Sequence, residues 1–196
     1  MENPPASQPQ PKEEPPHCVI PIHRPNWKEY AFFFSCGILV SIPFTLFFGQ
    51  AYPYFPEFVV IVLLAPFIEE LAKVFPLFYR HGETERSLVV LGILIGLGFG
   101  ISEFVLYVGF LGVDPLARIP GIIFHASSAA ITAYGIAKKK PLPYYLTAVG
   151  LHMANNFFAV TGYPIISIFG DLVVLITTYY LAWTFYHKAS KDKMVV

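Results

Sequence analysis

The chain has 196 residues, of which 55% are hydrophobic and only 13% are charged. Soluble globular domains carry about 25% charged residues, so this composition excludes an ordinary soluble protein. The 13 basic and 13 acidic side chains balance to a net charge of zero, and we expect no nucleic-acid partner. Apolar runs long enough to cross a hydrocarbon core of about 30 Å recur along nearly the whole length. We therefore predict an integral membrane protein with one helical domain.

The first segment of the chain differs from the rest. Residues 1–29 are rich in proline and charge and contain no apolar core segment. They also lack the basic start and continuous apolar run of a cleavable signal peptide. We predict a disordered cytoplasmic tail over 1–29, a transmembrane helical domain over 30–187 and a basic cytoplasmic tail over 188–196.

Hydropathy predicts an all-α fold, a polytopic bundle of about six transmembrane helices. The expected spans are Ala31–Gln50, Phe58–Tyr79, Leu88–Leu111, Ile119–Ala137, Leu142–Val160 and Ile165–Tyr186. Each run has the length that a helix rising about 1.5 Å per residue needs to cross a bilayer. The runs do not alternate polar with apolar residues, so helices are favoured over the strands of a barrel.

The basic residues predict the orientation of these spans. They gather before the first span and after the second, fourth and sixth: Lys12, Arg24, Lys28, Arg80, Arg86, Lys138, Lys139, Lys140, Lys188, Lys191 and Lys193. The connections on the other side contain only Arg118. Since basic loops stay in the cytoplasm, we expect a multi-pass protein of the cell membrane with both termini cytoplasmic.

Polar side chains interrupt four successive spans at a similar depth. They are Glu69, Glu70 and Lys73 in the second span, Glu103 in the third, His125 in the fourth, and His152 and Asn156 in the fifth. A charge at the centre of a membrane helix costs about 2.5–3.5 kcal/mol on insertion scales. Such residues therefore face partners or a water-filled cavity, and we expect these to meet at or just outside the midplane.

The spacing of these residues suggests pairs. Glu69 and Lys73 stand four residues apart, so we expect them to form an ion pair that leaves Glu70 for another purpose. His152 and Asn156 have the same spacing and would present two donors to a developing oxyanion. Near the outer face, Arg118 and Asp171 are expected to form a structural pair.

Several classes of protease are excluded by their motifs. The sequence has no HExxH, no plausible GxSxG elbow and only one candidate intramembrane aspartate. A buried glutamate that activates water remains, with His152 and Asn156 stabilising the oxyanion. Alternatively, a divalent metal such as zinc could be bound by Glu70, Glu103, His125 and His152. The same polar residues could also be only interhelical contacts that hold the bundle together.

Four motifs occur in order on successive spans: EELAK at 69–73, GLGFGISEFVLY at 96–107, RIPGIIFH at 118–125 and HMANN at 152–156. In this the chain resembles the PrsW family of intramembrane proteases, within the group that includes the CAAX prenyl proteases and bacteriocin-immunity homologues. One departure is Phe104, where the family usually has Asn.

The resemblance implies an intramembrane endopeptidase that acts on membrane-anchored proteins. It implies that Glu69 and Glu70 are the catalytic pair and that Glu103 helps to activate water. It further implies that His125 supports the site and that His152 and Asn156 form the oxyanion pocket, with no cofactor certain. Two alternatives stay open: a non-catalytic scaffold like the Aph subunit of gamma-secretase, and a proton-coupled transporter that uses the Glu and His residues as a relay.

Overall fold

The computed structural model describes residues 22–51, 53–79 and 83–195, and within these residues it contains helices and no strands. The elements in chain order are α1 (Trp27–Ala51), the π-helix η1 (Val59–Leu64), α2 (Ala65–Val74), the 3₁₀-helix η2 (Phe75–Tyr79), α3 (Glu85–Gly109), α4 (Pro115–Ala137), α5 (Pro141–Val160) and α6 (Pro164–Lys188). Each of the six predicted apolar runs coincides with one long helix or with the η1–α2–η2 segment. Most of the predicted N-terminal tail, residues 1–21, lies outside the described residues.

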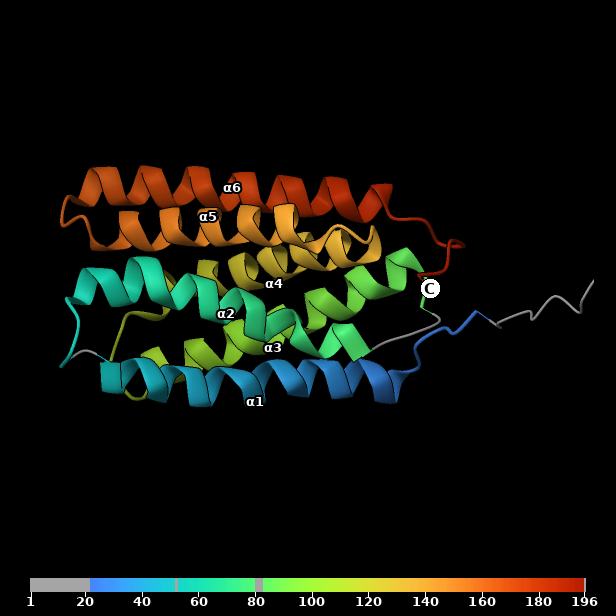
Figure 1. The fold of residues 1–196 in the computed structure, drawn as a ribbon. Coiled ribbons are helices and arrows are strands. Elements are labelled where there is room, and N and C mark those ends of the chain that lie inside the picture. Colours follow the sequence, from blue (N-terminus) through green and yellow to red (C-terminus); the bar gives the residue numbers. More distant parts are fainter. Residues whose placement is uncertain (1–21, 52, 80–82, 196) are drawn as a thin grey trace, which may run out of the picture.

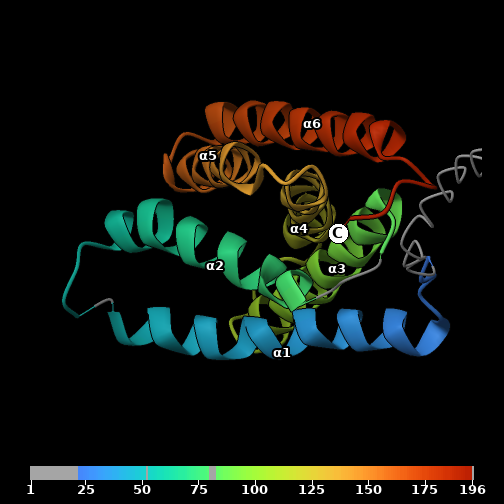
Figure 2. The ribbon, with the colours of Figure 1, turned by 45° about the vertical axis from the view of Figure 1, so that its right-hand side comes forward.

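Successive helices run up and down through one bundle, as Figure 1 shows. The bundle end at which α1 begins and α6 stops is called here the terminal end, and the other is called the far end. Helices α3 and α4 cross in the middle, with α1 packed on one side and α5 and α6 on the other (Figure 2). The buried core between them includes Phe33 of α1, Leu91 and Ile95 of α3, and Ala129 and Ala133 of α4.

Among the described residues, three helices, α3, α4 and α6, are long and apolar enough to cross a membrane, judged by length and composition. Helix α6 is the outermost of these, with only 22% of its most apolar window buried inside the bundle. Its exposed side chains are large and apolar, such as Ile165, Phe169 and Val173. An apolar surface of this size is typical of a face covered by lipid or by another protein.

The second predicted span is not one regular α-helix. It begins as a π-helix over Val59–Leu64, continues as α-helix, and ends as a 3₁₀ turn at Tyr79. Pro66 explains the irregular start, because proline has no N–H to donate to the preceding turn. The break leaves the carbonyl of Ile61 without its usual helical donors.

Residues 189–195 fold back onto the start of α3 at the terminal end. Val195 donates its backbone N–H to the Glu83 carbonyl at 2.8 Å, and the Glu85 N–H reaches the Lys193 carbonyl at 3.0 Å. The Glu85 carboxylate accepts hydrogen bonds from Lys138 and from the Ser190 N–H, and the bond from Lys138 raises the pKa of that lysine. These contacts tie the ends of α3, α4 and α6 together.

Close approach of α3 and α4 depends on Gly96. A Cβ at this position would lie 2.2 Å from the His125 carbonyl oxygen and 2.8 Å from Cβ of Ala129. Small residues permit such contact between membrane helices. The glycine therefore sets the distance between α3 and the segment of α4 that carries His125.

We expect Gly96→Ala to lower the free energy of unfolding by about 1–3 kcal/mol, because overpacking pushes α4 away. Gly150→Ala is the matched control, since a Cβ at Gly150 in α5 would meet no atom within 4 Å. Equilibrium unfolding in detergent micelles measures both variants. Equal stability of the two would contradict this account of the α3–α4 contact.

Candidate active site

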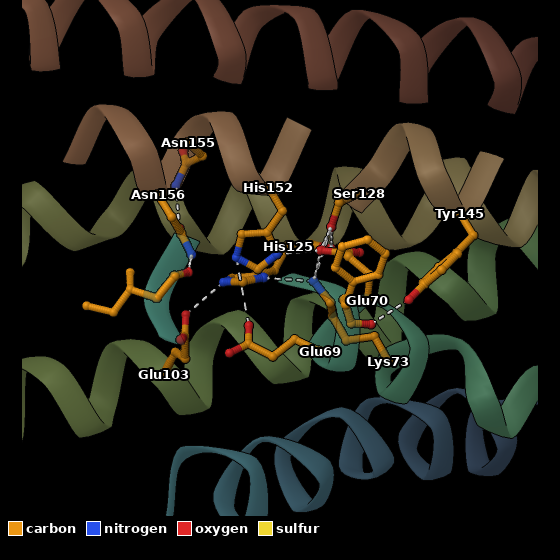
Figure 3. Close-up of polar contacts among 12 residues, drawn as sticks. Glu69, Glu70, Lys73, Glu103, His125, Ser128, Tyr145, His152, Asn155 and Asn156 are labelled. Carbon is orange, nitrogen blue, oxygen red and sulfur yellow. Dashed lines mark hydrogen bonds and ion pairs between the residues drawn. The ribbon is translucent and has the colours of Figure 1, made fainter. Parts of the chain in front are cut away.

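Four helices place ionisable side chains in one cluster inside the bundle, as Figure 3 shows. Glu69 and Glu70 come from α2, Glu103 from α3, His125 from α4 and His152 from α5. The rings of His125 and His152 lie 5.3 Å apart between centroids, and all five side chains are buried. The structure brings together these five residues, which the sequence predicts to meet (Figure 3).

The ion pair of α2 joins Lys73 to Glu70, and the predicted pair with Glu69 is wrong. Lys73 Nζ lies 2.5 Å from Glu70 Oε1, three residues away, and both side chains are fully buried. The same carboxylate oxygen accepts hydrogen bonds from Ser128 Oγ at 3.1 Å and from His152 Nδ1 at 2.8 Å. Glu70 thus accepts hydrogen bonds from side chains of three helices, α2, α4 and α5. Glu69 precedes it on α2, so its side chain points in a different direction, toward Nε2 of His152.

Hydrogen bonds define which nitrogen of His125 carries the ring proton. Lys73 Nζ lies 2.9 Å from His125 Nδ1, and an ammonium group can only donate, so Nδ1 accepts. The proton of the neutral ring is then on Nε2, which donates to Glu103 Oε2 at 2.7 Å. His125 therefore links the Lys73–Glu70 pair to Glu103.

His152 is oriented by Glu70 and faces Glu69. Because a carboxylate accepts, His152 Nδ1 donates to Glu70, and in the neutral ring Nε2 carries a lone pair. That Nε2 lies 3.8 Å from Glu69 Oε2, which is too far for a direct hydrogen bond. Within the described part of the chain, Glu69 has no direct hydrogen-bond donor on its carboxylate, in contrast to Glu70.

A cavity of about 460 Å³ adjoins this cluster, and Glu69, Glu103, His125 and His152 line it. Glu70 is not among its lining residues. The remaining walls extend to Val60 in the first turn of η1, Leu111 just beyond α3, and Val160 at the end of α5. All three lie at the far end of the bundle, so the cavity runs from the buried cluster toward that end.

Asn156 lines the cavity and donates a hydrogen bond to a backbone carbonyl that the irregular start of the second span leaves unpaired. The Ala65 N–H donates to the Val60 carbonyl, and residue 66 is a proline, so Ile61 lacks both of its usual helical donors. Asn156 Nδ2 supplies a hydrogen bond of 2.9 Å to that Ile61 oxygen. One of its two amide hydrogens is thereby engaged, and the other remains for the cavity that Asn156 lines.

Three residues of the site were not singled out for it by the sequence. Ser128, which binds Glu70, stands three residues after His125, so its spacing alone could have placed it on that face. Asn155 lines the cavity beside Asn156. Arg118 also lines it and pairs with Glu103 at 3.3 Å, so the predicted pair with Asp171 is wrong. The Oδ1 atom of Asp171 is buried without a hydrogen-bond partner among the described residues.

One set of side chains in the cluster lies close enough to hold a metal ion. Within the described residues, ligand atoms of Glu69, His125 and His152 all lie within 4.8 Å of one another. As hydrogen-bonded here, however, His125 has no free lone pair, because Nδ1 accepts from Lys73 and Nε2 donates to Glu103. Only Glu69 and His152 Nε2 remain, whereas zinc takes three or four protein ligands. This arrangement does not fit a zinc ion.

Comparison with known proteins identifies the family to which this chain belongs. The sequence profile described as PrsW family intramembrane metalloprotease matches residues 25–184. This range contains every residue of the cluster and all six long helical segments apart from the end of α6. No curated protein and no solved structure matches the chain. The match covers most of the sequence, so the chain belongs to the PrsW family and is an intramembrane protease.

Proposed function

We propose that this protease hydrolyses membrane-associated protein substrates with a water molecule that Glu69 activates. One observation carries the proposal: Glu69 Oε2 and His152 Nε2 lie 3.8 Å apart on the wall of the cavity. A single water oxygen can reach both atoms across a gap of this width. Both atoms accept, so such a water would donate its two hydrogens to them and turn its lone pairs toward the cavity.

Hydrolysis then needs one group, Glu69, that carries a proton from the water to the leaving nitrogen. The water oxygen bonds to the carbonyl carbon of the substrate, and one water proton moves to Glu69 as the tetrahedral oxyanion forms. When the C–N bond breaks, Glu69 returns that proton to the leaving nitrogen. The products are a new carboxyl terminus and a new amine, and the Glu69 carboxylate is restored.

The other polar residues have supporting roles in this proposal. The second amide hydrogen of Asn156 is available to the oxyanion. Glu70 is a positioning residue, because its hydrogen bond fixes the tautomer and the direction of the His152 ring. Glu103 does the same for His125 and adds a carboxylate to the cavity wall. No metal takes part in these steps.

The placement of the site in the membrane follows from the basic residues. With six spans and both termini in the cytoplasm, the terminal end faces the cytoplasm and the cavity runs toward the opposite side. The spans occupy residues 30–187, flanked by a cytoplasmic tail at each end. The substrate is then a membrane-anchored protein that presents its scissile bond in the outer half of the bilayer or at its outer surface.

Purified protein in proteoliposomes, mixed with a membrane-anchored fluorogenic reporter, tests the proposal. We expect cleavage that survives treatment with strong chelators, because the proposed mechanism uses no metal. Loss of cleavage on chelation, with recovery on adding zinc, would contradict the metal-free mechanism. Absence of cleavage by folded protein on a broad reporter set would instead favour the scaffold role.

A further inference from the structure

Arg118 is the only lysine or arginine among the described residues that line the cavity. It lies in the first turns of α4, seven residues before His125, and therefore on the same face of that helix. Seven residues correspond to about 10 Å along the helix axis. The backbone of Arg118 thus lies toward the far end, where the cavity extends, while its guanidinium reaches back to Glu103 of the cluster.

The guanidinium of Arg118 is only partly engaged by the protein. Its Nη2 is 3.3 Å from Glu103 Oε2, which is long compared with the 2.7–2.9 Å typical of charge-assisted hydrogen bonds. Its Nε is buried without a hydrogen-bond partner among the described residues. The group lies over the ring of Tyr107, 3.9 Å from the centroid, and 29% of the side chain is exposed. It is held in place, yet it retains donors for a ligand.

The surroundings of Arg118 indicate what that ligand is. Apart from its polar residues, the cavity is lined by apolar side chains, with Leu106, Leu111 and Val160 among them. A guanidinium recognises carboxylates through parallel N–H bonds, and it does so more strongly where water is scarce. The cavity therefore suits an apolar peptide segment that carries one acidic group.

Resting on the proposed function, we propose that Arg118 is a specificity-determining residue that selects substrates with an aspartate or glutamate close to the scissile bond. The guanidinium Nη2 is 3.3 Å from Glu103 Oε2, which is 2.7 Å from His125 Nε2. An extended chain advances about 3.3 Å per residue, so an acidic group bound there would lie about one to three residues from the scissile bond. Glu103 Oε2 is shared between Arg118 and His125 Nε2. A substrate carboxylate that draws Arg118 away leaves Glu103 to His125 alone, which couples binding of the acidic group to the catalytic cluster.

The test compares membrane-anchored reporter peptides that differ only in Asp or Asn at one position, scanned over the four residues on each side of the scissile bond. We expect wild-type protein to prefer Asp at a position one to three residues away by at least about tenfold in kcat/KM. Arg118→Gln should remove this preference, and Arg118→Glu should transfer it to peptides with Lys at that position. Cleavage by wild-type protein without any Asp preference would overturn the inference while sparing the proposed function.

Arg86→Gln is the matched control. Arg86 also lies over a tyrosine ring, that of Tyr186, but it is at the terminal end and outside the cavity, so the Asp preference should persist. Binding of the same peptides to Glu69→Gln protein, measured by fluorescence anisotropy, gives a readout that does not need turnover. Equal affinity for Asp and Asn peptides in that background would also overturn the inference. No cleavage of any reporter by folded wild-type protein would instead remove the proposed function on which it rests.

Discussion

Replacing Glu69 with glutamine should lower kcat for a membrane-anchored reporter by about a thousandfold while leaving the protein folded. The substitution keeps the shape of the side chain and removes only its capacity to take a proton from water, and general-base catalysis contributes about 10²–10⁴ to enzymatic rates. Glu69 has no direct hydrogen bond within the described residues, so little structure depends on its charge. Single-turnover cleavage in proteoliposomes, together with a thermal unfolding curve, measures both effects.

Glu57→Gln provides the control for this experiment. Glu57 is an exposed carboxylate just before η1 and does not line the cavity, so its substitution should leave kcat unchanged. Retention of more than a tenth of wild-type activity by Glu69→Gln would rule out Glu69 as the general base. Glu70 would then be the remaining carboxylate of the predicted catalytic pair.

Replacing Lys73 with methionine should lower the free energy of unfolding by about 3–5 kcal/mol. Lys73 and Glu70 are both fully buried, and removing one partner of a buried pair leaves the other charge uncompensated. Lys73 Nζ also donates toward His125 Nδ1 and to Ser128, so the substitution breaks the hydrogen bonds that orient the cluster. Reversible unfolding in mixed micelles measures the loss.

The double variant Lys73→Met with Glu70→Gln separates the lost charge from the lost packing. Because neither residue of the pair then leaves a buried charge without its partner, we expect the double variant to recover at least half of the stability that Lys73→Met loses. Lys188→Met, at an exposed position at the end of α6, should change stability by no more than about 0.5 kcal/mol. A double variant as unstable as the sum of its single variants would refute the buried pair as the cause.

The sequence was sufficient to predict the helices and the residues that meet between them. Long apolar runs leave little choice but helices, and charged groups within such runs must turn toward one another. For this reason Glu103, His125 and His152 were predicted to meet although they lie on different helices.

The sequence was not sufficient to predict which partner each group takes. Lys73 can reach a carboxylate three or four residues before it, and the position of Ser128 and His152 around Glu70 decides between them. Arg118 binds Glu103, fifteen residues earlier, through the packing of α3 on α4. The hydrogen bond from Asn156 to the Ile61 carbonyl depends on a π-helix that hydropathy does not reveal.

Isotope transfer from solvent tests the activated water most directly. Wild-type protein in excess over the membrane-anchored reporter would be allowed one turnover in H₂¹⁸O, and the new carboxyl terminus would be analysed by mass spectrometry. If Glu69 activates water, the first product carries one ¹⁸O atom at the water's isotopic enrichment. A first product that contains only ¹⁶O would mean that a protein carboxylate attacked the peptide bond itself, and it would contradict the account.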